Sequence, residues 1–79
     1  MEIKVLGSGC ARCKQLEKVT RIAVEELKLD AGVQKVEDVR KIMEYGVMRT
    51  PALVIDENVV LSGQVPKIAE LKELLRNYS

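Results

Sequence analysis

Two cysteines stand near the start of the chain, in the segment Cys10-Ala11-Arg12-Cys13. The segment follows a short apolar run and opens a long amphipathic pattern, so we expect it at a strand-to-helix turn. Unpaired backbone N–H groups and the partial positive charge at a helix start favour the thiolate form of Cys10, which is the nucleophilic form. Cys13 follows one turn later on the same side. The pair therefore predicts thiol–disulfide exchange, with Cys10 as the nucleophile and Cys13 as the resolving cysteine.

Two other interpretations of the cysteine pair stay open. The dithiol could bind a soft metal such as copper or mercury, or it could be an inert structural pair. A zinc site is disfavoured because the chain has no His, and two thiolates supply only half of a tetrahedral shell. Redox exchange is favoured because the pair lies at a helix start. We therefore expect no bound cofactor or metal.

Length and charge exclude several classes of protein. The chain has 79 residues, which predicts one domain over residues 1–79, and its 13 basic and 12 acidic residues leave a net charge of +1. Nothing in this balance indicates a nucleic-acid partner. The first residues include Glu2 and Lys4 and do not form a secretory signal, and no apolar run approaches the length of a membrane span. We expect a cytoplasmic monomer that does not bind a membrane.

Hydrophobic spacing and helix-end signals predict the secondary structure. Strands are expected at residues 3–6, 33–37, 52–55 and 59–61, and helices at residues 11–29, between residues 38 and 46, and from residue 66 onward. The segment from Asp30 to Gly32 should end the first helix, because glycine tolerates the left-handed exit conformation. Asp38 should cap the second helix, and Pro66 should take the first position of the last one.

The order of these elements is strand–helix–strand–helix–strand–strand–helix. The first strand–helix–strand unit should be parallel and right-handed, and the final hairpin antiparallel. This predicts an α/β fold with a mixed four-stranded sheet flanked by helices. The chain has no Trp and no Phe, so its core must be aliphatic. Met43 and Met48 are expected to fill gaps in that core, since methionine serves this purpose more often than metal binding.

Because three features occur together, the chain resembles the thioredoxin superfamily reduced to its minimal βαβαββα core. These features are the CxxC at a strand-to-helix turn, Thr50-Pro51 just before the third strand, and the element order. More narrowly, the Gly-x-Gly-Cys-x-x-Cys start and the stretch from Tyr45 to Ile55 are similar to the small prokaryotic thioredoxin-like redox-active disulfide proteins. The resemblance covers nearly the whole chain. It implies a redox-active Cys10–Cys13 disulfide, a cis bond before Pro51, and contact of Thr50 and Pro51 with the substrate.

The chain departs from the usual thioredoxin pattern at three places. Gly9 precedes the first cysteine where thioredoxins usually have Trp, and Ala11-Arg12 replaces Gly-Pro between the cysteines. Thioredoxins also place a buried Asp in the strand before the motif, where this chain has Lys4. The residue that handles the proton of Cys13 is therefore not identified. Arg12 is expected to tune Cys10 by favouring its thiolate.

The leading functional hypothesis is a thioredoxin-like protein disulfide reductase, or an electron carrier of that kind, which takes part in electron transport and cell redox homeostasis. Its partners would be protein disulfides and a separate reductase, because the chain has no nucleotide-binding pattern. A soft-metal carrier is the first alternative, although Ser8 stands where such domains usually have Met, and the chain should end on a helix. A glutathione-dependent glutaredoxin is the second, although residues 62–64 lack the acidic residue that usually holds the glutathione amino group. The physiological substrate, the electron donor and the reduction potential are left open.

Overall fold

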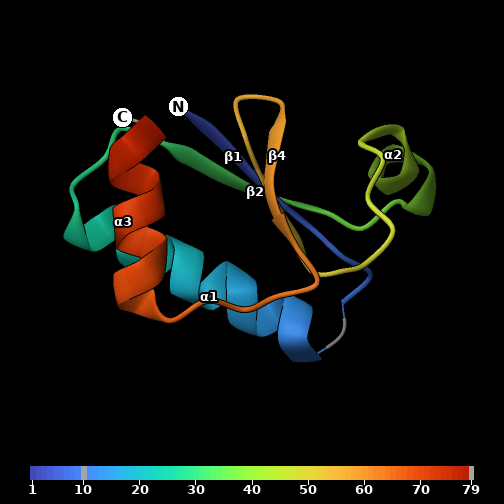
Figure 1. The fold of residues 1–79 in the computed structure, drawn as a ribbon, viewed down its shortest axis with the longest axis horizontal. Helices are drawn as coiled ribbons and strands as arrows, with labels where there is room; N and C mark the ends of the chain where they lie inside the picture. Colours follow the sequence, from blue (N-terminus) through green and yellow to red (C-terminus); the bar gives the residue numbers. More distant parts are fainter. Residues whose placement is uncertain (10, 79) are drawn as a thin grey trace.

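Four strands form one mixed sheet in the order β2-β1-β3-β4 (Figure 1). The computed structural model describes residues 1–9 and 11–78, so Cys10 and Ser79 lie outside the described residues. The strands are β1 (Glu2–Leu6), β2 (Gly32–Val36), β3 (Ala52–Ile55) and β4 (Asn58–Ser62). The β1–β2 pair is parallel, and the β1–β3 and β3–β4 pairs are antiparallel. These pairings confirm the predicted mixed sheet.

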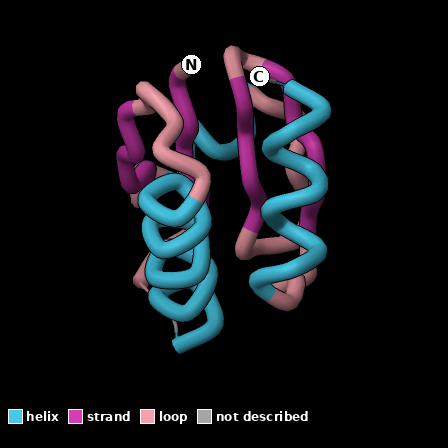
Figure 2. The backbone as a smooth tube through the Cα atoms, turned by 90° about the vertical axis from the view of Figure 1, so that its left-hand side faces the viewer, coloured by secondary structure: helices cyan, strands magenta, loops and turns pink. Residues whose placement is uncertain are grey.

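Three helices cover the sheet unequally. They are α1 (Ala11–Glu26), α2 (Val39–Glu44) and α3 (Ile68–Tyr78). The long helices α1 and α3 contact each other, and Figure 2 draws them as the two larger cyan coils. Because successive strand residues point to opposite faces, Ile3 and Val5 of β1 pack with α1 and α3, whereas Leu6 packs with α2. The predicted βαβαββα architecture is confirmed.

The main core lies between the sheet and the two long helices, and it is aliphatic as predicted. Its buried members come from β1, β3, α1 and α3: Ile3, Val5, Leu16, Ala23, Leu53, Ile55, Leu71 and Leu75. An ion pair between the Glu26 carboxylate and the Lys72 ammonium adds a polar link between α1 and α3. The other face of the sheet has a smaller cluster of Leu6, Ile42, Ala52 and Val54.

The end of α1 differs from the prediction. The helix ends at Glu26, and Lys28 rather than a glycine takes the left-handed conformation, with φ of 53°. The Lys28 and Leu29 N–H groups donate to the carbonyl oxygens of Glu25 and Val24, at 3.1 Å each, which closes the last turn. Leu29 thereby packs against the core. Gly32 does not end the helix, because it already belongs to β2.

The start of α3 and the two methionines also differ from the prediction. Lys67, not Pro66, directly precedes the helix, and its carbonyl oxygen accepts from the Leu71 N–H group at 3.0 Å. Met43 and Met48 are 69% and 96% exposed, so neither fills the core. On the six-residue helix α2, only Ile42 is buried against the sheet, and the neighbouring Met43 side chain is left in solvent.

The turn between β3 and β4 is tied to the first strand. Asp56 and Glu57 both have positive φ, 48° and 69°, which is the conformation of a two-residue hairpin turn. The Asp56 N–H group donates to the Glu2 carbonyl, and Asp56 Oδ1 accepts from the Glu2 N–H group, both at 2.8 Å. The start of β1 and the end of α3 lie at one end of the molecule, and the start of α1 lies at the opposite end (Figures 1 and 2).

Candidate functional site

The second cysteine of the motif packs against the end of β1. The Gly7 N–H group donates to the Val36 carbonyl at 2.9 Å, which continues the β1–β2 pairing by one residue. A Cβ atom at Gly7 would lie 2.9 Å from Cys13 Cβ, closer still to Cys13 Sγ, and 3.9 Å from Thr50 Cβ. The absence of a side chain at Gly7 thus makes the space that Cys13 occupies. Cys13 itself is 4% exposed.

The segment Thr50-Pro51 also approaches Gly7, because Thr50 Cβ lies 3.9 Å from the point where a Gly7 Cβ would stand. The peptide bond between the two residues is cis. Pro51 is buried, whereas Thr50 is exposed to solvent. The Pro51 carbonyl accepts a hydrogen bond of 2.7 Å from the Gly63 N–H group, which ties the segment to the end of β4. The site therefore brings together three separate parts of the sequence, around Gly7, Cys13 and Thr50.

Arg12 is exposed on the first turn of α1, and its guanidinium reaches across to the segment that follows β4. Its Nη2 atom donates to the Gly63 carbonyl oxygen at 3.0 Å. The hydrogen bond holds the charged group of Arg12 beside the residue that is bonded to Pro51. Cys10, the predicted nucleophile, lies outside the described residues, so an effect of Arg12 on its thiolate stays a prediction.

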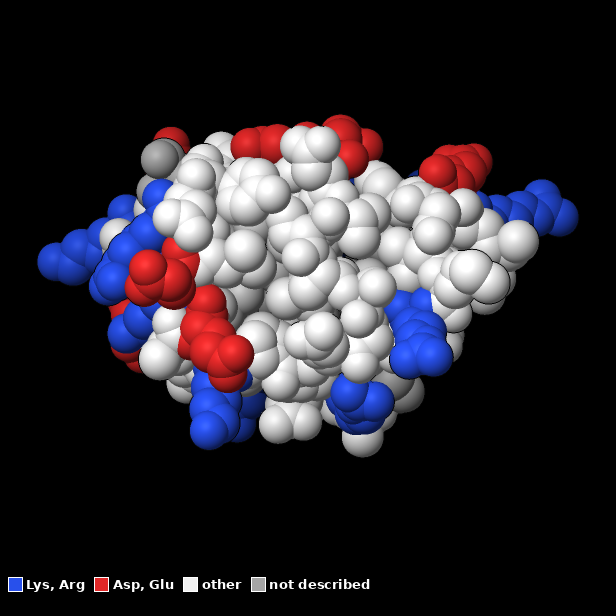
Figure 3. Space-filling view, in the orientation of Figure 1, with Lys and Arg blue, Asp and Glu red and all other residues white. Residues whose placement is uncertain are grey.

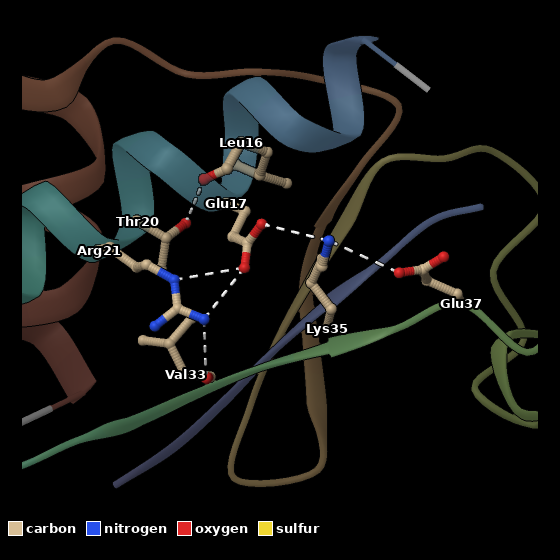
Figure 4. A network of polar contacts seen from close by, with 7 residues as sticks. All are labelled: Leu16, Glu17, Thr20, Arg21, Val33, Lys35 and Glu37. Carbon is tan, nitrogen blue, oxygen red and sulfur yellow. Dashed lines mark hydrogen bonds and ion pairs between the residues drawn. The ribbon is translucent and has the colours of Figure 1, made fainter. Parts of the chain in front are cut away.

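A network of charges fixes α1 against β2 (Figure 4). Glu17 accepts from Arg21 Nη2 at 3.0 Å and lies 3.7 Å from Lys35 Nζ. Lys35 in turn lies 3.6 Å from Glu37, whose Oε2 atom is 3.8 Å from the point where a Gly9 Cβ would stand. This chain of contacts holds the helix that begins at the motif, and it places a carboxylate beside the glycine that precedes Cys10.

Lys4 lies on the face of the sheet that α2 covers, where it joins a polar cluster. Its Nζ atom donates to Glu57 Oε1 at 2.7 Å and to the Tyr45 hydroxyl at 3.0 Å, and that hydroxyl donates to Glu57 Oε2 at 3.0 Å. The Lys4 side chain is 20% exposed and that of Glu57 is 62% exposed. Lys4, which departs from the acidic residue that the resemblance implied for this strand, thus pairs with a carboxylate of the hairpin turn.

The contacts within this cluster favour the charged forms of both partners. The hydrogen bonds from Lys4 and then Tyr45 lower the pKa of the Glu57 carboxyl below its ordinary value of 4.5. The hydrogen bonds to Glu57 and then to Tyr45 raise the pKa of the Lys4 ammonium above its ordinary value of 10.5. The cluster borders an open groove of about 560 Å³ along β2 and α2. The groove is lined by groups of both charges.

Within residues 1–9 and 11–78, no three side chains of Cys, Asp or Glu gather where they could hold a metal ion. Across the same residues, every helix is too short or too polar to cross a membrane.

Sequence reasoning missed three residues of the site. Gly7 must lack a side chain because Cys13 occupies the space beside it. Gly63 must lack one because its φ is 71° and the stem of Arg49 lies against it. Atoms Cβ and Cδ of Arg49 would stand 3.2 and 3.3 Å from a Cβ at Gly63. A glycine directly after a strand was the available signal for Gly7. Nothing in the sequence pattern relates Arg49 to residue 63.

Comparisons with known proteins agree with this architecture. The family profile of the thioredoxin domain matches residues 1–76. A thioredoxin of Methanocaldococcus jannaschii is 41% identical over 76 residues, covering 96% of this chain and 87% of the relative. A thioredoxin of Methanothermobacter thermautotrophicus is 39% identical over 75 residues, covering 95% and 97%. A probable thioredoxin of Archaeoglobus fulgidus is 34% identical over 70 residues, covering 85% and 76%. On this profile match and these relatives, the chain belongs to the thioredoxin family.

Proposed function

We propose that this protein is a thiol–disulfide oxidoreductase that reduces protein disulfides, with Cys10 as the nucleophile and Cys13 as the resolving cysteine. The observation that carries the proposal is the position of Cys13. Its side chain is buried against Gly7 and lies next to Thr50, at the start of α1. A shielded second thiol beside a segment that can receive a substrate is the arrangement that thiol exchange within a CxxC motif requires.

The reaction proceeds in two exchanges that balance in electrons and protons. The Cys10 thiolate attacks one sulfur of the target disulfide, and the other target sulfur leaves as a thiolate that takes up a proton. Cys13 then loses its proton and attacks the Cys10 sulfur, which breaks the mixed disulfide and releases the second target thiolate. The target has gained two electrons and two protons, and the protein is left with a Cys10–Cys13 disulfide. A separate reductase supplies two electrons and two protons to restore the dithiol.

Thr50 is suited to holding an extended substrate segment during these steps. The residue is exposed, and no hydrogen bond within residues 1–9 and 11–78 uses its backbone N–H or C=O group. Pro51 next to it is buried and bonded to Gly63, so the presented backbone is held in place. A target chain can therefore pair with Thr50 as an added strand does, while its disulfide lies at the cysteine motif.

The proposal is tested by reduction of insulin disulfides with dithiothreitol as the electron source. We expect turnover by the wild-type protein, none by Cys10→Ser, and covalent complexes with target proteins for Cys13→Ser, because its mixed disulfide cannot be resolved. Lys18→Ala is the matched control, since it changes an exposed residue of the same helix. Activity of Cys10→Ser together with loss of activity in Cys13→Ser would reverse the two roles.

A titration of the reduced protein with Cu(I) separates the redox function from the metal-carrier alternative. The proposal predicts turnover that depends on Cys10 and no tight one-to-one Cu(I) complex. Absence of turnover combined with such a complex would overturn the redox proposal and make the dithiol a metal-binding site.

A further inference from the structure

Gly63 is the point where the substrate-facing segment meets two arginines from distant parts of the sequence. Its N–H group donates to the Pro51 carbonyl at 2.7 Å, and its carbonyl oxygen accepts from Arg12 Nη2 at 3.0 Å. The Cβ and Cδ atoms of Arg49 lie 3.2 and 3.3 Å from the point where a Cβ on Gly63 would stand, so the stem of Arg49 packs closely on this glycine. Arg12 and Arg49 therefore both contact Gly63, and Gly63 is hydrogen-bonded to Pro51.

Neither arginine forms an ion pair with a carboxylate among residues 1–9 and 11–78, although both are exposed. Arg21 differs from them, because Glu17 lies four residues away on the same helix and accepts its hydrogen bonds. In Figure 3, Lys and Arg atoms but no Asp or Glu atoms lie along the lower right margin, where Figure 1 places the start of α1 and the segment before β3. On this face of the molecule, basic side chains therefore stand along the margin without acidic side chains beside them.

The chemistry of the two side chains defines what they can recognise. A guanidinium carries five N–H donors in a planar fork that matches the two oxygens of a carboxylate. The hydrogen bond from Arg12 to Gly63 uses one of these donors, and the Arg12 side chain is exposed, so other donors remain available to a ligand. An extended target segment that pairs with Thr50 would pass within reach of this pair, because Thr50 lies between Arg49 and Pro51 in the chain.

We propose that Arg12 and Arg49 form a carboxylate-recognition surface that selects disulfide targets with Asp or Glu side chains next to the reacting cysteine. The inference rests on the proposed function and adds to it the chemical class of the partner, an acidic protein segment. The net charge of the whole chain is only +1, so the protein exerts little long-range attraction on acidic targets. The preference for acidic segments therefore acts on a target segment that is already docked at the site.

The test uses two synthetic peptides, each closed by one internal disulfide, that differ only by Glu or Gln at the two positions beside a cysteine. The measured quantity is the ratio of kcat/KM for the Glu peptide to that for the Gln peptide. We expect a ratio of about three to ten for the wild-type protein at low salt, as one or two exposed ion pairs provide, and a ratio that falls as sodium chloride is added.

Matched variants assign the preference to the two arginines. Arg49→Gln should bring the ratio close to one, and Arg49→Glu should invert it in favour of a third peptide that carries Lys at the same positions. Arg12→Gln should lower the ratio as well. Lys41→Gln removes the same charge from an exposed position on α2 and should keep the wild-type ratio. Thermal unfolding followed by circular dichroism verifies that each variant is folded.

The possible outcomes separate the two proposals. Equal kcat/KM for the Glu and Gln peptides in the wild-type protein would overturn the carboxylate surface and leave the reductase function standing. A preference that survives in Arg49→Gln and Arg12→Gln would overturn the assignment to these residues. Reduction of none of the peptides would overturn the proposed function itself.

Discussion

On one face of the sheet, Ile3, Val5, Leu53 and Ile55 lie beneath the two long helices, whereas on the other face Leu6, Ala52 and Val54 lie beneath the short helix α2. The first face is closed by side chains that are out of contact with water. The second is covered by one buried residue of α2, and beside it lie a polar cluster and an open groove. The comparison indicates that most hydrophobic stabilisation comes from the face of α1 and α3.

The candidate site lies where these two differently covered faces meet. Cys13 belongs to α1 on the closed face, and Thr50 follows α2 from the open face. Gly7 separates them at the end of β1. The Cys13 side chain is thus held by the well-packed half of the molecule, and Thr50-Pro51 is joined to the thinly packed half. Pro51 is nonetheless fully buried and hydrogen-bonded to Gly63, so both sides of the candidate site are held in place.

The largest effect should come from core truncations that compare the two faces directly. Leu71→Ala removes a fully buried side chain between α3 and the sheet, and we expect it to lower the free energy of unfolding by about 3–5 kcal/mol. Ile42→Ala on the other face should cost about 2 kcal/mol, because fewer neighbours surround the cavity it leaves. Urea unfolding measures both. Equal costs for the two variants would contradict the unequal roles of the two faces.

A smaller effect is expected at the boundary between the faces. Gly7→Ala places a methyl group in the space of the Cys13 side chain, and we expect a loss of about 1–3 kcal/mol in stability together with about a tenfold loss of insulin reduction. Gly32→Ala is the matched control, since no atom lies within 4 Å of its Cβ position and its φ is not in the left-handed region. If Gly7→Ala behaves like Gly32→Ala in both assays, the packing of Cys13 against Gly7 contributes neither to stability nor to activity.

The smallest effect concerns the polar cluster on the open face. The pKa of Glu57 is lowered in the folded protein, so its contribution to stability is present above the ordinary value of 4.5 and is lost as pH falls through the folded-state pKa. We therefore expect wild type to be more stable than Glu57→Gln at neutral pH and the difference to vanish in acid.

The same cluster contains Lys4, whose pKa is raised, so its contribution is lost only as pH rises above the ordinary value of 10.5. Urea unfolding of wild type, Lys4→Met, Glu57→Gln and the double variant, repeated across pH, isolates the coupling between the two side chains. A stability difference between wild type and Glu57→Gln that is the same at every pH would show that the ion pair is not its source.

The sequence predicted most of the fold because short-range signals are strong in this chain. Asp38 caps α2 as expected, with its side chain accepting from the Arg40 N–H group at 2.9 Å, and β3 spans the predicted residues. The errors lie where tertiary packing overrides local preference. Lys28 adopts the left-handed conformation without being glycine, since Leu29 can then return to the core. Met48 is apolar yet exposed, because no element covers it.

The amino-acid sequence by itself determined the family, the order of the elements and the position of the cysteine motif at a helix start, because these depend on residue types and on spacing along the chain. Only the tertiary structure decided which distant residues meet. Sheet pairing brings Gly7, Thr50 and Gly63 to one end of the strands, and the hairpin turn carries Glu57 to Lys4. Contacts between residues more than forty positions apart, such as that of Arg12 with Gly63, have no local signal because they arise from the register and twist of the assembled sheet.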